Sequence, residues 1–375
     1  MPASASPNGT PVGALLAAAL ALPGMMATVA HAESVPDAGQ IAFKYLDYRD
    51  WQPGADRMRV KSPSLYILKP LPDSFAVEGT LVYDGMSGAS PRYYNSLSGA
   101  SGQGVTDYRT AGDVKVTKYF ERVSVGIGGA VSSERDYLSR AASLDVRVST
   151  PDNNRTWAFG IAGTGDVINS VNGVAENQRR HTLDVLLGVT QVWSADAIVQ
   201  SNLTYSTGHG YYSDPYKLLD TRPDRRRVLA WLTRANRYLP TYDATVQLSY
   251  RLLSDSFGTT SNTVEIAWVQ ALPAGWSVTP SLRYYTQNSA DFYYNPPFPR
   301  GYVNGQHYTA DTRLSAFGAL TPGVWVIKRF ADGWSADVKL EYSRQSSAWR
   351  LGGSGSPGIE TFSARWIQAG IAKTF

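Results

Sequence analysis

The chain has 375 residues, and its 35 Lys and Arg against 31 Asp and Glu give a net charge of +4, too small to indicate a nucleic acid partner. It has no Cys, which excludes disulfides, thiolate metal sites and covalent haem attachment. A polar mean hydropathy of -0.25 with 23 Tyr, 10 Trp and 34 Gly is typical of a transmembrane β-barrel, in which only alternate strand residues face lipid.

We predict that residues 1–32 are a signal peptide that is removed. They contain no Lys, Arg, Asp or Glu, residues 12–22 are apolar, and Ala30-His31-Ala32 before Glu33 has the small-x-small form of a cleavage site between Ala32 and Glu33. The segment lacks the basic side chain that such peptides normally carry near their start. Beyond Glu33 no apolar stretch reaches the roughly 18 residues of a spanning helix, so a helical membrane protein is not expected.

Residues 33–74 leave two interpretations open. A hairpin at 41–68 could form the first two strands of a barrel. Four prolines between residues 53 and 72 could instead belong to a periplasmic arm or a segment that fills the lumen, because proline cannot donate a hydrogen bond inside a sheet.

From residue 75 to residue 375 apolar and polar residues alternate, as where Val338 and Leu340 alternate with Asp337, Lys339 and Glu341. A strand places such charges on one face, so we expect an apolar face toward lipid and a polar face toward a wet lumen. Charges in the lumen could set a transverse field that tunes which solutes pass, or could pair with one another and stiffen the cylinder. The charges expected there are Asp113, Lys115, Asp145, Arg147, Arg251, Glu265, Asp337, Lys339 and Glu341.

Short and long links alternate between these strands. We expect short turns at 119–122, 151–154, 194–196, 239–242, 273–275 and 331–333, and longer links at 85–108, 165–178, 208–225, 288–308 and 346–360, with brief outer links at 133–136 and 254–258. Outer-membrane barrels have short periplasmic turns and longer external loops. The predicted fold is therefore an all-β, antiparallel up-and-down barrel of about 16 strands, or about 14 without the first hairpin, with both termini in the periplasm.

The last strand ends in Phe375, as is typical of barrels that insertion machinery places in the outer membrane. An open sheet edge in lipid would leave backbone groups unpaired, so this strand must close the sheet. Aromatic residues near strand ends are expected to form girdles at the headgroup level; the alternative is a track for carbohydrate stacking or electron transfer. These residues are Trp193, Trp276, Trp334, Tyr205, Tyr284 and Tyr285.

Four ordered motifs resemble those of the domain of unknown function 3570, an uncharacterised group of bacterial outer-membrane proteins. They are Asp84-Gly85-Met86-Ser87-Gly88-Ala89-Ser90-Pro91; Ser213-Asp214-Pro215-Tyr216-Lys217 with Arg222-Pro223 and Arg225; Ser254-Asp255-Ser256-Phe257-Gly258; and Leu282-Arg283-Tyr284-Tyr285-Thr286-Gln287 through Phe292-Tyr293. The resemblance covers nearly all of the mature chain and implies the outer membrane without a reaction. The family resemblance leads us to expect a histidine at position 262, but this chain has Asn262 there.

Each loop motif allows two interpretations. Residues 87–91 could expose backbone N–H groups to an anion or fold into the barrel mouth, or form an ordinary loop. Residues 214–227 could bias an entrance toward anions, or form a loop held by its own ion pairs. Asp84, Asp214 and Asp220 could hold Ca²⁺ through oxygen ligands, but the sequence predicts no cofactor.

An enzyme is not expected. His31 leaves with the signal peptide, and His181, His209 and His307 are spread over one predicted strand and two loops, without the spacing of a nucleophile or metal site. His209, which is near Asp214, is the residue that we would test.

The leading hypothesis is a porin-like channel for small polar solutes, since about 16 strands leave an aqueous lumen unless something fills it. The alternatives are a scaffold that holds a periplasmic protein, lipoprotein or electron carrier, and then a hydrolase.

Overall fold

The computed structural model describes residues 34–88, 92–93, 96–97, 105–217, 219–295 and 305–375. The predicted signal peptide with Ala32 and Glu33, and the loop residues Ser90 and Pro91, lie outside the described residues. No helix in the described part of the chain is long and apolar enough to cross a bilayer. Its helices are the short 3-10 turns η1 (Pro240–Tyr242), η2 (Pro273–Gly275), η3 (Thr312–Leu314), η4 (Ala331–Gly333) and η5 (Ser347–Trp349).

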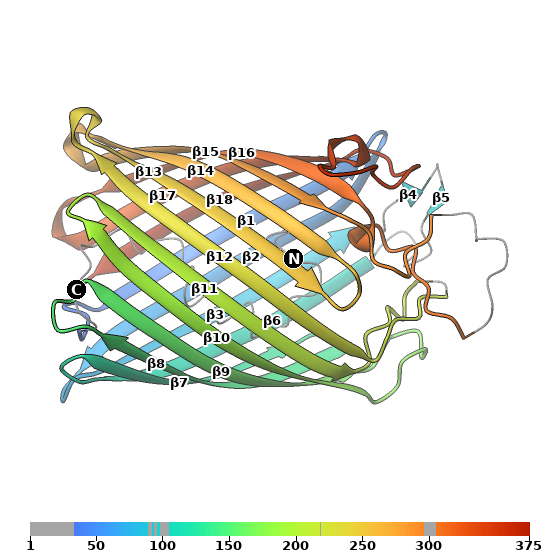
Figure 1. Cartoon of the computed structure of the whole chain (residues 1–375), viewed down its shortest axis with the longest axis horizontal. Coiled ribbons are helices and arrows are strands. Elements are labelled where there is room, and N and C mark those ends of the chain that lie inside the picture. Colours follow the sequence, from blue (N-terminus) through green and yellow to red (C-terminus); the bar gives the residue numbers. More distant parts are fainter. Residues whose placement is uncertain (1–33, 89–91, 94–95, 98–104, 218, 296–304) are drawn as a thin grey trace.

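Sixteen strands of the described residues form one closed antiparallel barrel (Figure 1). Sequential strands pair, and β1 pairs with β18 from Gln40↔Thr374 to Trp51↔Ser363, which closes the sheet. The strands are β1 (Gln40–Gln52), β2 (Ala55–Leu71), β3 (Phe75–Gly88), β6 (Val105–Tyr119), β7 (Val123–Ser133), β8 (Tyr137–Ser149), β9 (Arg155–Ile168), β10 (Gln178–Ser194), β11 (Ala197–Gly210), β12 (Arg225–Leu239), β13 (Ala244–Asp255), β14 (Thr260–Leu272), β15 (Trp276–Gln287), β16 (Phe317–Arg329), β17 (Trp334–Ser346) and β18 (Phe362–Thr374). The predicted fold is confirmed with 16 strands rather than 14. The strands β4 (Arg92–Tyr93) and β5 (Ser96–Leu97) pair only with each other.

The first hairpin is part of the barrel. β1 and β2 pair with each other, and β2 continues the sheet to β3. Pro63 lies inside β2, opposite Tyr45, and the ladder from β2 to β3 has no pairs at Ser62 and Pro63. The proline is therefore accommodated where the sheet does not need its missing N–H.

Apolar side chains cover the outer surface of the barrel. On β10, Leu183, Val185 and Leu187 are 44–45% exposed, whereas Thr182 and Asp184, which alternate with them, are 6% and 1% exposed. Side chains on the concave face converge and cover one another, while those on the convex face spread apart. The exposed apolar positions therefore form the outer face, and an apolar outer band is what contact with lipid requires.

The two ends of the barrel differ (Figure 1). At one end, called here the turn end, links of two to five residues join the strands, and Gln40 pairs with Thr374. At the other, the loop end, lie the longer links, among them 169–177, 211–224, 288–316 and 347–361. The predicted asymmetry between short and long links is thus present.

Three turns repeat one arrangement. Asp73, Ala274 and Asp332 adopt φ angles of 58°, 58° and 56°, and an aromatic residue begins the strand two positions later. The lysine opposite that ring donates from Nζ to the carbonyl of the left-handed residue and lies 4.4–5.6 Å from the ring centroid. The lysine and ring pairs are Lys118 with Phe75, Lys328 with Trp276, and Lys373 with Trp334. Amphipathic rings and long cations favour the rim of an apolar band.

Some sequence expectations at the loop end are wrong. Residues 165–168 and 208–210 belong to β9 and β11, so His209 lies in a strand rather than in a loop. The glycines that suggested a loop serve close packing, since a Cβ on Gly208 would lie 2.1 Å from Tyr212 Oη. Tyr284 and Tyr285 cannot both belong to a girdle, because consecutive residues face opposite sides; Tyr285 faces inward and packs 5.6 Å from Phe317.

Two glycines at opposite ends of the barrel give a matched test of turn geometry. Gly275 and Gly54 have φ angles of +77° and +71°, but a Cβ on Gly275 would lie 2.7 Å from the Arg329 carbonyl oxygen, whereas nothing lies within 4 Å at Gly54. We expect Gly54→Ala to lower the free energy of unfolding by about 1–2 kcal/mol and Gly275→Ala by more. Urea unfolding in detergent micelles, followed by tryptophan fluorescence, measures both. Equal losses would contradict the role given to the Arg329 contact.

Candidate functional site

Charged side chains on the inner face form ion pairs that skip a strand. Lys115 of β6 lies with its Nζ 2.9 Å from Asp145 Oδ1 of β8, across the intervening strand β7. The pair passes over Gly126 of β7, where a Cβ would lie 2.5 Å from Lys115 Cε and 2.6 Å from Asp145 Oδ1. The missing side chain therefore lets both charges lie flat against the wall.

The same arrangement occurs twice more. Asp337 of β17 and Lys44 of β1 approach to 3.8 Å over Gly370 of β18, where a Cβ would lie 2.5 Å from Asp337 Oδ1. Arg283 of β15 and Glu341 of β17 lie 2.8 Å apart across β16, where a Cβ on Gly323 would lie 3.0 Å from Glu341 Cγ. We call these three the glycine-crossed pairs. Side chains of alternate strands can meet only on the concave face, so these contacts identify the lumen side.

All nine charges predicted to face the lumen occupy inner positions. Two chains of ion pairs extend the glycine-crossed pairs, because Lys115 also lies 3.6 Å from Glu78, and Glu265, Arg283, Glu341 and Lys339 follow one another at 2.8, 2.8 and 3.2 Å. Among the described residues, Asp113 has no basic group and Arg251 no carboxylate within 4.0 Å, while Arg147 does have an interaction partner. Sequence reasoning did not name Lys44, Glu78, Asp184, Arg234 or Arg283 as lumen charges, although strict alternation along their strands would have found them.

The lumen charges are unevenly distributed around the barrel. Away from its ends, β3 to β8 carry three acids against two bases, while β12 to β15 carry three bases against one acid. In the ring of strands β6 and β14 are eight positions apart, so the two groups lie on opposite walls. The first group is Glu78, Asp113, Asp145, Lys115 and Arg147, and the second is Arg234, Arg251, Arg283 and Glu265. A polar solute between these walls would experience a field across the barrel axis.

At the loop end, four links share one apolar cluster, which we call the loop cap. Phe257, which is 1% exposed, packs edge-on against Phe292 with the ring centroids 5.0 Å apart, and Tyr212 lies 5.8 Å from Phe257. The cluster contains residues of the β11–β12, β13–β14, β15–β16 and β17–β18 links. Its members are Phe257, Ala290, Phe292, Tyr293 and Leu314, with Tyr212 and Ile359 packed against them.

Asp255 organises the Ser-Asp-Ser-Phe-Gly motif. Its Oδ1 accepts hydrogen bonds from the backbone N–H groups of Phe257 at 3.1 Å and Thr259 at 2.9 Å. Arg226 donates from Nε to Asp255 Oδ2 at 2.9 Å, and its guanidinium lies 4.8 Å from the Phe257 ring centroid. One carboxylate thus folds the turn and holds the cation that covers the buried ring.

The acidic and basic residues of 214–227 form ion pairs with another link. Arg222 lies 2.7 Å from Asp220 and 2.9 Å from Asp311, with side chains no more than 3% exposed. Arg313 lies 3.0 Å from Asp214. These contacts join the β11–β12 link to the β15–β16 link. Burial alone would raise the pKa of Asp311, but the positive charges of Arg313, Lys217 and Arg222 lower that pKa well below its ordinary value.

The carboxylates considered for Ca²⁺ each face an arginine. Asp214 and Asp220 pair with Arg313 and Arg222, and Asp84 accepts from Arg109 Nε at 2.7 Å. A guanidinium therefore stands where a metal ion would bind. No group of three or more metal-ligating side chains occurs among the described residues.

The remaining motif residues extend the loop cap sideways. Tyr216 Oη donates to Asp136 and accepts from the Val171 N–H at 3.1 Å, while the Pro215 carbonyl accepts from Asn172 Nδ2 at 2.8 Å. The Lys217 N–H donates to the Asp214 carbonyl at 3.1 Å. The β7–β8 and β9–β10 links are therefore tied to the same assembly.

Other predicted residues lie apart from the loop cap. Arg225 is exposed on the outer face of β12, opposite His209. His209 is also opposite His181, with the ring centroids 5.5 Å apart. Sequence reasoning missed this pair because it assigned His209 to a loop. Ser87 and Gly88 belong to β3 and pair through the backbone with Arg59 and Met58 of β2.

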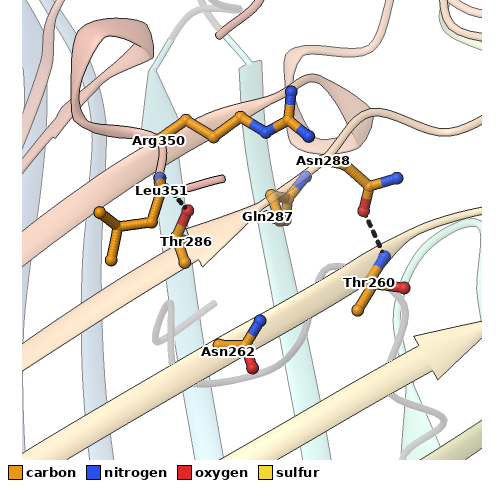
Figure 2. A pocket seen from close by; sticks show the side chains of 7 residues that line it. All are labelled: Thr260, Asn262, Thr286, Gln287, Asn288, Arg350 and Leu351. Carbon is orange, nitrogen blue, oxygen red and sulfur yellow. Dashed lines mark hydrogen bonds between the residues drawn. The ribbon is translucent and has the colours of Figure 1, made fainter. Parts of the chain in front are cut away.

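Asn262 lines a cavity of about 210 Å³ (Figure 2). Its Oδ1 accepts from Tyr250 Oη at 2.7 Å. Around the cavity, the Leu351 N–H donates to Thr286 Oγ1 at 3.0 Å and the Thr260 N–H to Asn288 Oδ1 at 2.5 Å. Polar groups of Asn262, Asn288 and Thr286 in the cavity lining therefore already have hydrogen-bond partners within the protein. Its lining residues are Thr260, Asn262, Thr286, Gln287, Asn288, Arg350 and Leu351.

Comparison with known proteins identifies a family. The family model described as Protein of unknown function (DUF3570) matches residues 12–176 and 172–366, which confirms the resemblance in the motifs. No curated protein matches. Among solved structures, CdiB from Acinetobacter baumannii has 8% identity and a TM-score of 0.49, and the match covers 88% of this chain but only 60% of CdiB.

Two other solved structures have similar scores. OccAB1 from Acinetobacter baumannii has 11% identity and a TM-score of 0.44, with 92% of this chain and 100% of that chain covered. An anion-selective porin from Comamonas acidovorans has 11% identity and a TM-score of 0.42, with 90% and 98% covered.

The glycine-crossed pairs can be tested at Gly126. We expect Gly126→Ala to push Lys115 and Asp145 off the wall and to lower the free energy of unfolding by about 1 kcal/mol or more, as overpacking does. Gly163→Ala is the matched control, because a Cβ there meets nothing within 4 Å. Urea midpoints of the two variants measure the difference. Indistinguishable midpoints would show that Gly126 is not needed for the ion pair.

The loop cap should resist mild acid. The lowered pKa of Asp311 means that its contribution to stability is complete above its unfolded pKa of about 3.9 and is lost only as pH falls through the lower folded value. We therefore expect hydrogen exchange in the described parts of the two links, 211–217, 219–224, 288–295 and 305–316, to reveal equal protection at pH 7 and pH 5. Asp311→Asn should lower the free energy of protection of both links at pH 7 by about 3–5 kcal/mol, because it leaves Arg222 buried and partly unpaired. Asp152→Asn, in a turn at the turn end of the barrel, is the control. Loss of protection in these links of the wild type at pH 5 would contradict the lowered pKa assigned to Asp311.

Proposed function

The chain belongs to the family described as Protein of unknown function (DUF3570), and from its own geometry we propose that it is a porin-like channel for small polar solutes in the bacterial outer membrane. In this proposal the apolar band contacts the acyl chains. The turn end with both termini faces the periplasm and the loop end faces outward, in keeping with the usual asymmetry of link length.

The glycine-crossed pairs carry the proposal. Long charged side chains on sixteen strands could reach across the lumen and fill it. Here Lys115, Arg283 and Lys44 are instead drawn sideways onto carboxylates two strands away, over glycines that leave room for them. A wall built this way remains polar while these three long side chains lie along it rather than across the lumen, as a water-filled channel requires.

The opposed charges suggest the class of solute. Excess acid on the β3 to β8 wall and excess base on the β12 to β15 wall would orient a solute with a dipole or with charges of both signs. Arg251 belongs to the basic wall, and among the described residues no carboxylate lies within 4.0 Å of its guanidinium. It is therefore the residue that we assign to selectivity.

A scaffold is the second candidate. The loop cap joins four links through buried aromatic contacts and buried ion pairs, and such a rigid body could close the mouth or hold a protein partner. In that case the role of the ion pairs in the lumen would be to make the barrel rigid. We propose no catalytic role, because His209, the histidine singled out for testing, lies on the outer wall opposite His181.

We also propose that barrel-insertion machinery recognises the C-terminal strand. Phe375 is 61% exposed at the seam, and its N–H donates to the Gly39 carbonyl at 2.9 Å while its own carbonyl accepts from the Gly39 N–H at 2.8 Å. The aromatic side chain is thus accessible on the strand that closes the barrel.

Conductance in a planar lipid bilayer tests the channel. We expect the wild-type protein to conduct, and Arg251→Gln to shift the permeability ratio toward cations by roughly two- to threefold, as expected for one charge about 6 Å from a permeating ion in water. Arg237→Gln removes an exposed charge from the outer face and should leave the ratio unchanged. A folded, inserted protein that does not conduct would contradict the channel, and a partner that co-purifies with it would support the scaffold.

A further inference from the structure

Three arginines stand side by side on the outer wall near the loop end. Arg49 of β1 pairs in register with Arg365 of β18 on one side and with Arg59 of β2 on the other. Arg49 shares its face with Phe43 and Tyr45, which are 45% and 37% exposed on the outer wall. Directly opposed side chains in a sheet have Cβ atoms about 5 Å apart, so three guanidinium groups share one row.

This arginine row lacks sufficient counter-charge. Asp47 lies 2.8 Å from Arg59 and 3.5 Å from Arg49. No carboxylate within 4.0 Å of Arg365 is found in the described ranges, and its Nε is enclosed without a hydrogen-bond partner. Like charges directly opposite one another are destabilising. One carboxylate among three arginines therefore leaves two positive charges that call for an external anion.

Two further cations flank the row. Arg344 of β17 and Lys61 of β2 are exposed at outer positions, and Arg344 lies 5.8 Å from the Trp349 ring centroid. Lys61 is opposite Asp47 in the register. The outer wall over β17, β18, β1 and β2 thus presents a concentration of positive charge, which we call the arginine patch with its five cations.

The height of the arginine patch matches a headgroup layer. Ile41 marks the apolar band of β1 at the turn end, and the eight residues from there to Arg49 advance about 20 Å along the barrel axis at a rise of about 3.3 Å and a tilt of about 40°. The apolar band of such barrels is about 25 Å tall. Arg49 therefore lies near the upper edge of the band, where lipid phosphates would be found.

We propose that the arginine patch binds a lipid whose headgroup carries two phosphates, in the leaflet that surrounds the loop end. Guanidinium groups match phosphate oxygens in bidentate geometry, and a phosphate monoester carries about 1.5–2 negative charges. Two phosphate groups therefore balance the net positive charge of the arginine patch, which is that of its five cations reduced by the negative charge of Asp47. The inference rests on the membrane placement in the proposed function but not on conduction.

Lipid binding in detergent micelles tests the proposal without a bilayer. Native mass spectrometry of the refolded barrel would compare bisphosphorylated lipid A, the same lipid with one phosphate, and phosphatidylcholine. We expect affinity to fall in that order for the wild type. In Arg49→Gln/Arg365→Gln the apparent Kd for the bisphosphorylated lipid should rise at least about tenfold, since each charge-assisted hydrogen bond contributes appreciably to binding.

Lys69→Gln/Arg237→Gln is the matched control, because it removes two exposed outer charges at the turn end. It should keep wild-type affinity within about twofold. Equal losses in both double variants, or equal binding of the three lipids by the wild type, would overturn the proposal. Arg365→Lys, which retains charge but not the bidentate fork, should bind with intermediate affinity and serves if the double variant does not refold. A protein that binds lipid A but does not conduct would refute the channel alone.

Discussion

Backbone pairing around the whole sheet is the constraint on which the other features depend. In a bilayer an unpaired N–H or C=O costs several kcal/mol, and pairing of β1 with β18 removes the two edges where such groups would remain. Closure gives every strand one convex and one concave face. Alternation with a period of two therefore follows along the barrel, and a chain whose mean hydropathy is polar can still present an apolar exterior.

Curvature then separates the behaviour of charges on the two faces. On the concave face side chains of alternate strands converge, so Lys115 can reach Asp145 when Gly126 stands between them. On the convex face side chains diverge, and Arg365 has no such neighbour among the described carboxylates. A lumen cation such as Lys115 is thus neutralised by another side chain of the wall, whereas an outer cation such as Arg365 depends on what surrounds the barrel.

Sequence reasoning reached the fold and the lumen charges because both follow from local alternation. It could identify the Ser-Asp-Ser-Phe-Gly motif but not its partners, since Arg226, which donates to Asp255, lies on a neighbouring strand, and Phe292, which packs against Phe257, lies in a separate link. Sequence reasoning also could not identify the role of Gly126. A glycine in a strand indicates close approach of other atoms, but only the register places Asp145 opposite Gly126, and only the structure shows that Lys115, which pairs with Gly128, reaches diagonally over it.

The loop cap also constrains the order in which the molecule can be built. Its apolar cluster includes Tyr212 from the β11–β12 link and packs against Ile359 from the β17–β18 link. Both residues can reach the cluster together only when the hairpins between β11 and β18 have taken their places in the sheet. We therefore expect the loop cap to form late in assembly. A rigid loop cap is then a property of the closed barrel and not of a sheet that is still open.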